Sequence, residues 1–221
     1  MTSPDFFHEL IASLNQGLLM TIMLIIPSAF GGVIIGITAG ALRSFGSLHV
    51  RKAGDAFAAV FRGTPLVVQL FILYFGLPNL GIYLSPYTAA VTGFILCSGA
   101  YQSEYVRGAL LSVKQNQYMG AQALGFSKFH TIFWIIIPQA LRRALPGCGN
   151  EIIYMIKYSS LAYIVTCMEL TGHGKVFATE YFRFTEVFVV IGFYYLFLVS
   201  IAKIILRKLE QRLYVPGFGR S

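Results

Sequence analysis

Charged side chains inside long apolar stretches are the residues of this sequence best suited to do chemistry. Glu104, Glu151 and Lys157 each fall within or at the end of such a stretch. A charge in a bilayer costs roughly 2.5 to 3.5 kcal/mol even on a lenient insertion scale, so these groups are expected to face protein or water. Glu104 and Arg107 are three residues apart, which favours an ion pair on one helix face. Glu151 and Lys157 are six residues apart, so they lie on different faces and need other partners.

A polar stripe is predicted along the segment that carries Glu151 and Lys157. Asn150 lies seven residues before Lys157 with Tyr154 between them, and helical periodicity places these three on nearly the same face. Two interpretations stay open, namely interhelical hydrogen bonds that hold spans together and the lining of a water-filled path for polar solutes. The candidate pathway residues are Asn150, Glu151, Tyr154, Lys157, Ser159 and Ser160.

The sequence contains no recognisable catalytic or nucleotide-binding motif. Its four histidines are scattered, and HExxH, GxSxG and paired carboxylates on one helix face are absent. It has no GxxxxGK[ST] motif to cradle ATP phosphates, and its three cysteines lack metal-ligand spacing. We therefore expect a chain that is not an enzyme and that binds neither a cofactor nor a metal itself.

Membrane-spanning helices are the elements predicted to position these residues. Of 221 residues, 56% are hydrophobic and only 12% are charged, whereas charged residues make up about 25% of soluble domains. Uncharged stretches run over 10–42 and 63–103, and one membrane helix needs about 20 residues. The second stretch is interrupted by the turn sequence LPNLGIYLSP (77–86), so it holds two spans. We predict an all-α membrane domain over 1–221 with five spans, at about 14–42, 57–80, 86–112, 144–168 and 184–206.

Basic residues predict the orientation of these spans. Fourteen of the 17 Lys and Arg residues lie between spans 1 and 2, between spans 3 and 4, or after span 5, against Lys175 and Arg183 on the other side. The positive-inside rule makes the basic side cytoplasmic, with the N-terminus outside and the C-terminus inside. The net charge of +8 thus reflects topology, because the basic residues flank apolar spans and form no nucleic-acid-binding motif.

Several separated motifs occur in an order shared with a known family. The longest reads SEYVRGALLSVKQNQYMGAQALGFSKFHTIFWIIIPQALRRALPGCGNEIIYMIKYSSLAYIV (103–165). The others are GLLMTIMLI (17–25), RGTPLVVQLFILYFGLP (62–78) and MELTG (168–172). Together they resemble bacterial ABC importer permeases of the polar amino acid uptake family, over most of the chain. The resemblance implies a type I ABC importer permease fold.

The resemblance also implies a cytoplasmic coupling loop at 114–138, with a short helix that docks into a cleft on a separate ATP-binding subunit. Met119 stands where the family has a glutamate, so contact there is expected to depend on shape and apolar surface more than on charge. The family motif of EAA, glycine and I-x-L-P maps onto Met119, Gly120, Ala121, Gly125, Ile135, Ile137 and Pro138.

The residue types of this loop agree with docking. Ala121, Ala123 and Leu124 favour a helix, and Gly125 is expected either to end it in a left-handed turn or to let another backbone come close. Exposed phenylalanines on such a loop are expected to be buried by a partner or to dip into the lipid interface. The expected coupling residues are Met119, Gly120, Ala121, Ala123, Leu124, Gly125, Phe126 and Phe129, with Glu104, Arg107 and Pro138 in structural roles.

The predicted function is that of a permease subunit in an ATP-driven importer of polar amino acids, working by alternating access in the bacterial inner membrane. The resemblance implies two ATP-binding subunits that hold ATP and Mg, a second permease copy or a sister permease, and a soluble periplasmic or lipid-anchored amino acid binding protein. The segment YSSLAYIVTCMELTG (158–172) looks nearest to arginine-type permeases, and glutamine, histidine or lysine fit nearly as well. The alternative is a secondary transporter or channel that needs no ATPase, although the inverted repeat common in such proteins is absent.

Overall fold

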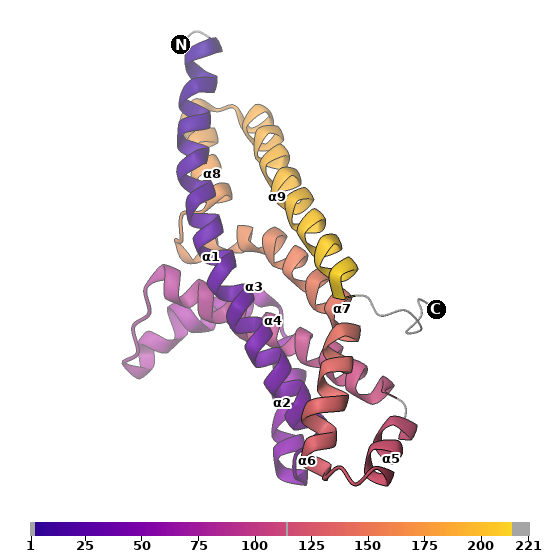
Figure 1. Ribbon diagram of the computed structural model, residues 1–221. Helices are drawn as coiled ribbons and strands as arrows, with labels where there is room; N and C mark the ends of the chain where they lie inside the picture. The colour runs from indigo at the N-terminus through magenta and orange to yellow at the C-terminus, as the bar shows by residue number, and fades with distance from the viewer. Residues whose placement is uncertain (1–2, 114, 214–221) are drawn as a thin grey trace.

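The computed structural model describes residues 3–113 and 115–213, and its regular elements in these ranges are all helices (Figure 1). The predicted all-α fold is thus confirmed. Short stretches of π-helix (Ile72–Gly76, Thr131–Ile136) and of 3-10 helix (Leu77–Leu80, Ser159–Val165) connect some of the helices. The α-helices are α1 (Ser3–Phe45), α2 (Leu48–Gly63), α3 (Leu66–Phe71), α4 (Pro86–Ser112), α5 (Gln115–Ala123), α6 (Lys128–His130), α7 (Ile137–Tyr158), α8 (Leu170–Tyr181) and α9 (Phe184–Leu213).

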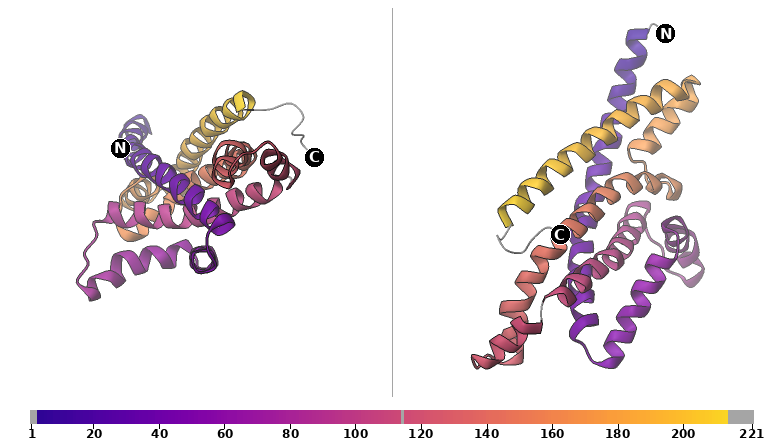
Figure 2. Two further views of the ribbon diagram at one scale, coloured as in Figure 1. Left: turned by 60° about the horizontal axis from the view of Figure 1, so that its bottom comes forward. Right: turned by 90° about the vertical axis from the view of Figure 1, so that its right-hand side faces the viewer.

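The molecule is elongated along α1, with α8 and the start of α9 near its N-terminal end and α2, α5 and α6 near the other (Figures 1 and 2). With 43 residues, α1 is about 64 Å long at 1.5 Å per residue, so it exceeds the roughly 30 Å of a hydrocarbon core. Within the described residues, two helices are long and apolar enough to cross a membrane, Asp5–Phe45 and Phe184–Leu213, or three if the bent segment from Leu48 to Leu80 is one span. The five-span topology remains a proposal.

Close contact between α1 and α4 depends on three glycines of α1 that are spaced four residues apart. A Cβ atom added at Gly36 would lie 2.5 Å from the Cβ of Gln102, and one added at Gly40 would lie 2.8 Å from the Cβ of Val106. At Gly32, the third glycine, an added Cβ would lie 3.0 Å from the hydroxyl of Ser98 on α4. Small residues at this spacing let two membrane helices approach at the backbone level.

α1 continues through Pro27 because α4 supplies a replacement hydrogen bond. Proline has no N–H, so it leaves the carbonyl of the residue four positions earlier without its helical donor. That carbonyl belongs to Met23, and the hydroxyl of Tyr87 at the start of α4 donates to it at 3.0 Å. The contact with α4 therefore also satisfies the α1 carbonyl group that Pro27 leaves without a helical donor.

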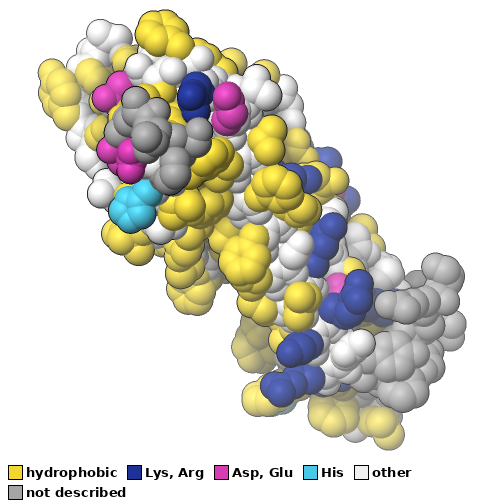
Figure 3. All heavy atoms as spheres, turned by 90° about the horizontal axis from the view of Figure 1, so that it is seen from above, with side chains coloured by type: hydrophobic (Ala, Val, Ile, Leu, Met, Phe, Trp, Pro, Cys, Tyr) yellow, Lys and Arg dark blue, Asp and Glu magenta, His cyan; other side chains and the backbone are white. Residues whose placement is uncertain are grey.

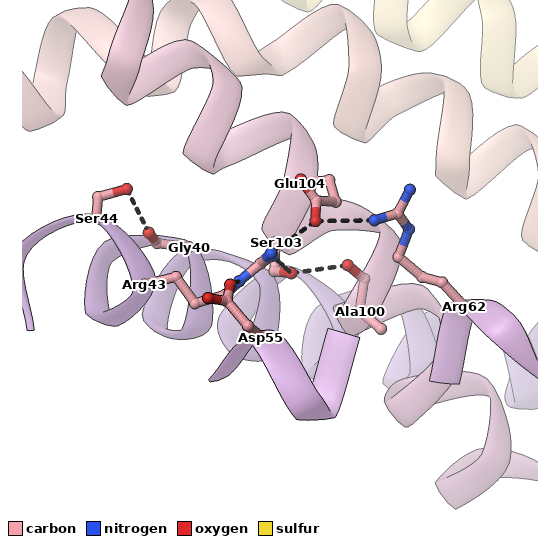
Figure 4. Close-up of polar contacts among 8 residues, drawn as sticks. All are labelled: Gly40, Arg43, Ser44, Asp55, Arg62, Ala100, Ser103 and Glu104. Carbon is pink, nitrogen blue, oxygen red and sulfur yellow. Dashed lines mark hydrogen bonds and ion pairs between the residues drawn. The ribbon is translucent and has the colours of Figure 1, made fainter. Parts of the chain in front are cut away.

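A cluster of charged side chains joins α1, α2 and α4 at the end of α1 (Figure 4). Arg43 is 6% exposed. Its guanidinium donates to Asp55 of α2 at 2.8 Å and to Glu104 of α4 at 2.7 Å, and a further donor bonds the Ser103 hydroxyl at 2.9 Å. Arg62 of α2 bonds the same Glu104 oxygen at 2.8 Å. The hydrogen bond from Arg43 lowers the pKa of Asp55 below its usual value.

The predicted pairing of Glu104 with Arg107 is wrong. Among the described residues, the ion pairs of Glu104 go to Arg43 and Arg62, on two other helices. The reason is burial, because Arg43 sits where three helices meet and its charge has to be compensated there. A pair within one helix, such as that with Arg107, is worth only about 0.2 to 0.5 kcal/mol.

The segment predicted as one span at 57–80 is bent by 102° at residues 64–65. Pro65 cannot donate a helical hydrogen bond, so α2 ends at Gly63 and a new helix begins at Leu66. The side-chain amide of Gln69 donates to the carbonyls of Phe61 and Thr64 at 2.9 and 3.0 Å, which satisfies the exposed end of α2. The bend is therefore stabilised from both sides.

The span predicted at 144–168 is not a single helix either. α7 ends at Tyr158, a 3-10 turn follows to Val165, and Thr166 has a left-handed backbone with φ of 64°. The hydroxyl of Ser159 donates to the carbonyl three residues earlier at 2.8 Å, and Ser160 does the same. Serine side chains compete in this way with the regular helical bonds, which explains why the helix tightens there.

Glu169, which the sequence did not single out, ties α8 to α1 and α9. Its buried carboxylate accepts the backbone N–H groups of Thr171 and Gly172, the second and third residues of α8, at 2.8 and 2.9 Å, and the Tyr195 hydroxyl of α9 at 2.9 Å. The Leu170 N–H donates to the Thr21 hydroxyl of α1 at 3.0 Å. The signal was present in MELTG (168–172), because an acidic residue directly before a helix is a good N-cap.

We predict that Gly36→Ala destabilises the protein by about 1 to 3 kcal/mol, the usual cost of overpacking. The added methyl group meets Gln102 at 2.5 Å and its backbone carbonyl carbon at 3.2 Å, so α4 has to move away. The matched control is Gly192→Ala in α9, where an added Cβ meets nothing within 4 Å; alanine is expected to be neutral or slightly stabilising there. Thermal unfolding in detergent measures both, and equal melting temperatures would contradict the close-contact argument.

Candidate functional site

α5 ends in a left-handed turn at Gly125, which has a φ of 82°. The N–H of Phe126 donates to the carbonyl of Ala121 at 3.1 Å, and the N–H of Gly125 donates to that of Gln122 at 2.9 Å. This pair of bonds is a Schellman motif, in which glycine is the favoured residue. A Cβ at Gly125 would meet nothing within 4 Å, so of the two predicted roles the helix-ending turn is confirmed within this chain.

A nearly continuous helix follows from Lys128 to Tyr158. The Ser127 hydroxyl begins it by accepting the N–H of His130 at 3.3 Å. Pro138, which was expected to have a structural role, does not end this helical run, which passes through it. The π-helical turn Thr131–Ile136 directly before Pro138 changes the hydrogen-bond register where the proline has no N–H to donate.

Exposed apolar side chains gather around this turn. Leu124 is 79% exposed, and the rings of Phe126 and Phe129 also lie open to the surroundings. Of the other predicted coupling residues, Gly120 and Ala123 are exposed and Ala121 is buried. We call the following set the α5–α6 patch: Met119, Leu124, Phe126, Phe129, Phe133 and Trp134.

Phe133 and Trp134 are members of the patch that the sequence interpretation missed. Trp134 is 73% exposed, and the rings of Phe129 and Phe133 pack with their centroids 4.4 Å apart. The two phenylalanines are four residues apart, the spacing of neighbours on one helix face. This four-residue spacing is visible in the sequence, but residues 114–138 were interpreted as a coupling loop with one short helix, and the second helix that begins at Lys128 was not predicted.

The predicted polar stripe lies on the exposed face of α7. Asn150, Tyr154 and Lys157 are all exposed, and the Lys157 ammonium lies 4.0 Å from the centroid of the Tyr154 ring. A lysine over an aromatic face is held by a cation–π interaction. The structure thus brings these three residues together.

Glu151, Ser159 and Ser160 do not join the stripe as one cluster. Glu151 is 4% exposed and accepts a hydrogen bond from the Tyr158 hydroxyl at 3.1 Å. Ser159 is buried, and its hydroxyl donates a hydrogen bond to the carbonyl of Ile156. The hydroxyl of Ser160 likewise donates to the carbonyl of Lys157. The only formal charge that this part of α7 presents to its surroundings is therefore that of Lys157.

Metal-binding groups are not assembled within residues 3–113 and 115–213, where no three His, Cys, Asp or Glu side chains are placed to hold an ion. The arrangement that remains consists of an apolar patch at one end of a long helix and a cationic polar stripe at its other end. An apolar patch is suited to contact with a partner surface, and a polar stripe is suited to contact with a polar solute.

Known proteins are similar to this chain in sequence. The Escherichia coli (strain K12) glutamine transport system permease protein GlnP is 38% identical over 202 residues, which cover 90% of this chain and 92% of that protein. The Bacillus subtilis (strain 168) probable amino-acid ABC transporter permease protein YckA is 36% identical over 197 residues, with coverage of 89% and 87%. These relatives confirm the family resemblance of the sequence motifs.

Solved structures agree with the sequence relatives. A crystal structure of an amino acid ABC transporter with histidines matches with a TM-score of 0.86 and 28% identity, over 93% of this chain and 96% of that one. The MetNI methionine ABC transporter in an inward-facing form shares the fold with a TM-score of 0.77 at 18% identity, over 97% and 100%. The family model of the binding-protein-dependent transport system inner membrane component matches residues 32–215. The chain therefore belongs to this family, the multi-pass inner-membrane permeases of ABC importers.

Proposed function

We propose that this chain moves polar amino acids into the bacterial cytoplasm as the permease subunit of an ATP-driven importer that works by alternating access. The observation that carries the proposal is the α5–α6 patch, a group of exposed aromatic and aliphatic side chains on a fold shared with ABC permeases. The names of the glutamine and amino-acid permease relatives support the class of substrate.

The α5–α6 patch has the composition of a docking surface. Aromatic side chains and methionine are enriched in the buried centres of protein interfaces, while charged residues are depleted there. The patch has no carboxylate at Met119, and its rigid core is the Phe129–Phe133 ring pair. We infer that it docks into an ATP-binding subunit, chiefly by shape and apolar contact. Insertion of the same rings into the lipid interface is the competing interpretation.

The proposed assembly contains two ATP-binding subunits, which hold ATP and Mg, and a second permease, either a further copy of this chain or a sister chain. A soluble or lipid-anchored binding protein delivers the amino acid from outside. The absence of a phosphate-binding motif from the sequence agrees with ATP binding in a partner. The distribution of basic residues supports an N-terminus outside and a C-terminus in the cytoplasm.

We further propose that neutral polar amino acids are favoured over cationic ones. Lys157 is exposed on the stripe, while Glu151 is buried and bonded to Tyr158. A path lined by this stripe presents a positive charge, which attracts carboxylates and repels cationic side chains. A preference for neutral substrates differs from the expectation based on residues 158–172, which resemble arginine-type permeases. It agrees with the substrate named for the glutamine permease relative.

Gly125→Val is expected to reduce ATP-driven uptake severalfold and to weaken retention of the ATP-binding subunit. Valine in a left-handed conformation costs about 1 to 2 kcal/mol, so the turn that shapes the patch is expected to open. The matched control is Gly63→Val, because an added Cβ meets nothing within 4 Å there and the backbone needs no positive φ. Co-purification of the ATP-binding subunit and uptake in vesicles measure the effect, and full uptake by Gly125→Val would refute the docking role.

Lys157→Gln is expected to raise the ability of arginine and lysine to compete with labelled glutamine by about fivefold or more, since one charge at 4 Å is worth about 1 kcal/mol even in water. Glu151→Gln, the control variant, is expected to leave the order of preference unchanged because that carboxylate faces Tyr158. Competition uptake in vesicles that contain the full transporter measures both. A shift in preference for Glu151→Gln but not for Lys157→Gln would reverse the assignment.

A further inference from the structure

An apolar groove of about 430 Å³ lies between α1, α4, α7 and α9, within the range of about 300 to 1,000 Å³ that is typical of ligand sites. It is lined almost entirely by aliphatic side chains. Those that define its walls include Ile37 of α1, Val106 of α4, Leu141 and Leu145 of α7, and Leu206 and Leu209 of α9. A groove with this lining accepts a hydrocarbon chain and disfavours a polar solute.

The groove begins where α7 and α9 cross. At Gly149 an added Cβ would overlap the Leu206 side chain, so the two helices touch at that point. From there the lining continues along α9 to Leu209 and Leu213 and along α7 back to Pro138. It therefore runs from the helix crossing toward the end of α7 that leads to the α5–α6 patch, the side on which basic residues predominate.

Among the described residues, Arg142 is the one charged residue that lines the groove. Its side chain is exposed, and within the described part of the chain no hydrogen bond, ion pair or cation–π contact engages its guanidinium. On α9, which forms one wall of the groove, the C-terminal half carries further basic residues. On the face shown in Figure 3, basic side chains gather toward this end of the molecule. The basic residues of α9 are Lys203, Arg207, Lys208 and Arg212; none of them lines the groove, so they indicate the basic side of the molecule and are not part of the proposed site.

We propose that the groove binds an anionic phospholipid of the cytoplasmic leaflet, with an acyl chain between α7 and α9 and the phosphate group at Arg142. The planar guanidinium of arginine is well suited to a phosphate, which it can bind through two parallel hydrogen bonds. Basic pockets between membrane helices on the cytoplasmic side are a known arrangement for anionic lipid head groups. The inference uses the proposed placement in the membrane but not the identity of the transported solute.

Charge complementarity disfavours a second copy of this chain as the occupant. The sequence has nine acidic residues. Asp55 and Glu104 already pair with arginines, and Glu151 and Glu169 are buried. Asp5, Glu9, Glu180 and Glu186 belong to the side predicted to be outside. That leaves Glu210 as the single carboxylate that another copy can offer to Arg142, whereas an anionic leaflet offers a phosphate at every lipid.

Native mass spectrometry of the purified, fully assembled transporter tests the site. The sample is incubated with equal amounts of phosphatidylglycerol and phosphatidylcholine that have identical acyl chains. The wild type is expected to retain more phosphatidylglycerol. Arg142→Gln is expected to reduce that retention about fivefold and Arg142→Lys to restore part of it. Arg207→Gln, which removes an exposed arginine of α9 outside the groove, is the matched control and is expected to have little effect.

A second pair of variants tests the acyl-chain part of the groove. Leu209→Gln is expected to lower the retention of both lipids, while Ile205→Gln on another face of α9 is not. Equal retention of the two lipids by the wild type, or equal losses for Arg142→Gln and Arg207→Gln, would overturn the proposal. The proposal would also be overturned if the Leu209→Gln variant lost the second permease subunit but retained its lipid, because the groove would then be a contact between permease subunits. These readouts are independent of uptake, so they remain informative if the proposed transport function fails.

Discussion

The close approach of α1 and α4 is the contact on which the rest of the structure depends. Between helices in lipid there is no hydrophobic driving force, so packing of small residues and interhelical hydrogen bonds have to replace it. Gly36 and Gly40 bring α1 against Gln102 and Val106 of α4, and the Tyr87 hydroxyl replaces the hydrogen bond that Pro27 removes. At the end of this contact, Arg43 gathers carboxylates from α2 and α4. These ion pairs fix α2 against α1 and α4, and α2 in turn positions the bent segment that follows it.

The helical run from Lys128 to Tyr158 connects the two parts of the candidate site. Its 31 residues span about 46 Å at 1.5 Å per residue, with the α5–α6 patch at one end and Lys157 at the other. Under the proposed function, a partner that moves the patch also moves the polar stripe, because a packed helix transmits displacement as a unit. Within this helix the Tyr158 hydroxyl donates to the buried Glu151, so under the proposed function the exposed face with Lys157 is the one that meets a solute.

Local signals in the sequence were sufficient where one segment determines its own structure. The limits of α4, Pro86–Ser112, coincide with the predicted 86–112 because a turn sequence rich in proline and glycine precedes it and no proline interrupts it after its first residue. Predictions failed where side-chain contacts between elements, rather than the pattern within one segment, decide the outcome. Glu104 pairs across helices because Arg43 is buried beside it, and the break at Pro65 is stabilised by Gln69, four residues further along the chain. The sequence placed Glu151 and Lys157 on different helix faces, but only the packed structure shows that the face with Glu151 is the buried one.

The most direct test of the account is uptake of labelled glutamine by liposomes that contain this permease with its ATP-binding subunits and binding protein. Accumulation against a gradient is predicted to require ATP inside the compartment that holds the ATP-binding subunits, and to stop when those subunits are removed. A coupled importer gives this result because the chain has no phosphate-binding motif of its own. Accumulation that continues without the ATP-binding subunits would instead identify a secondary transporter and contradict the account.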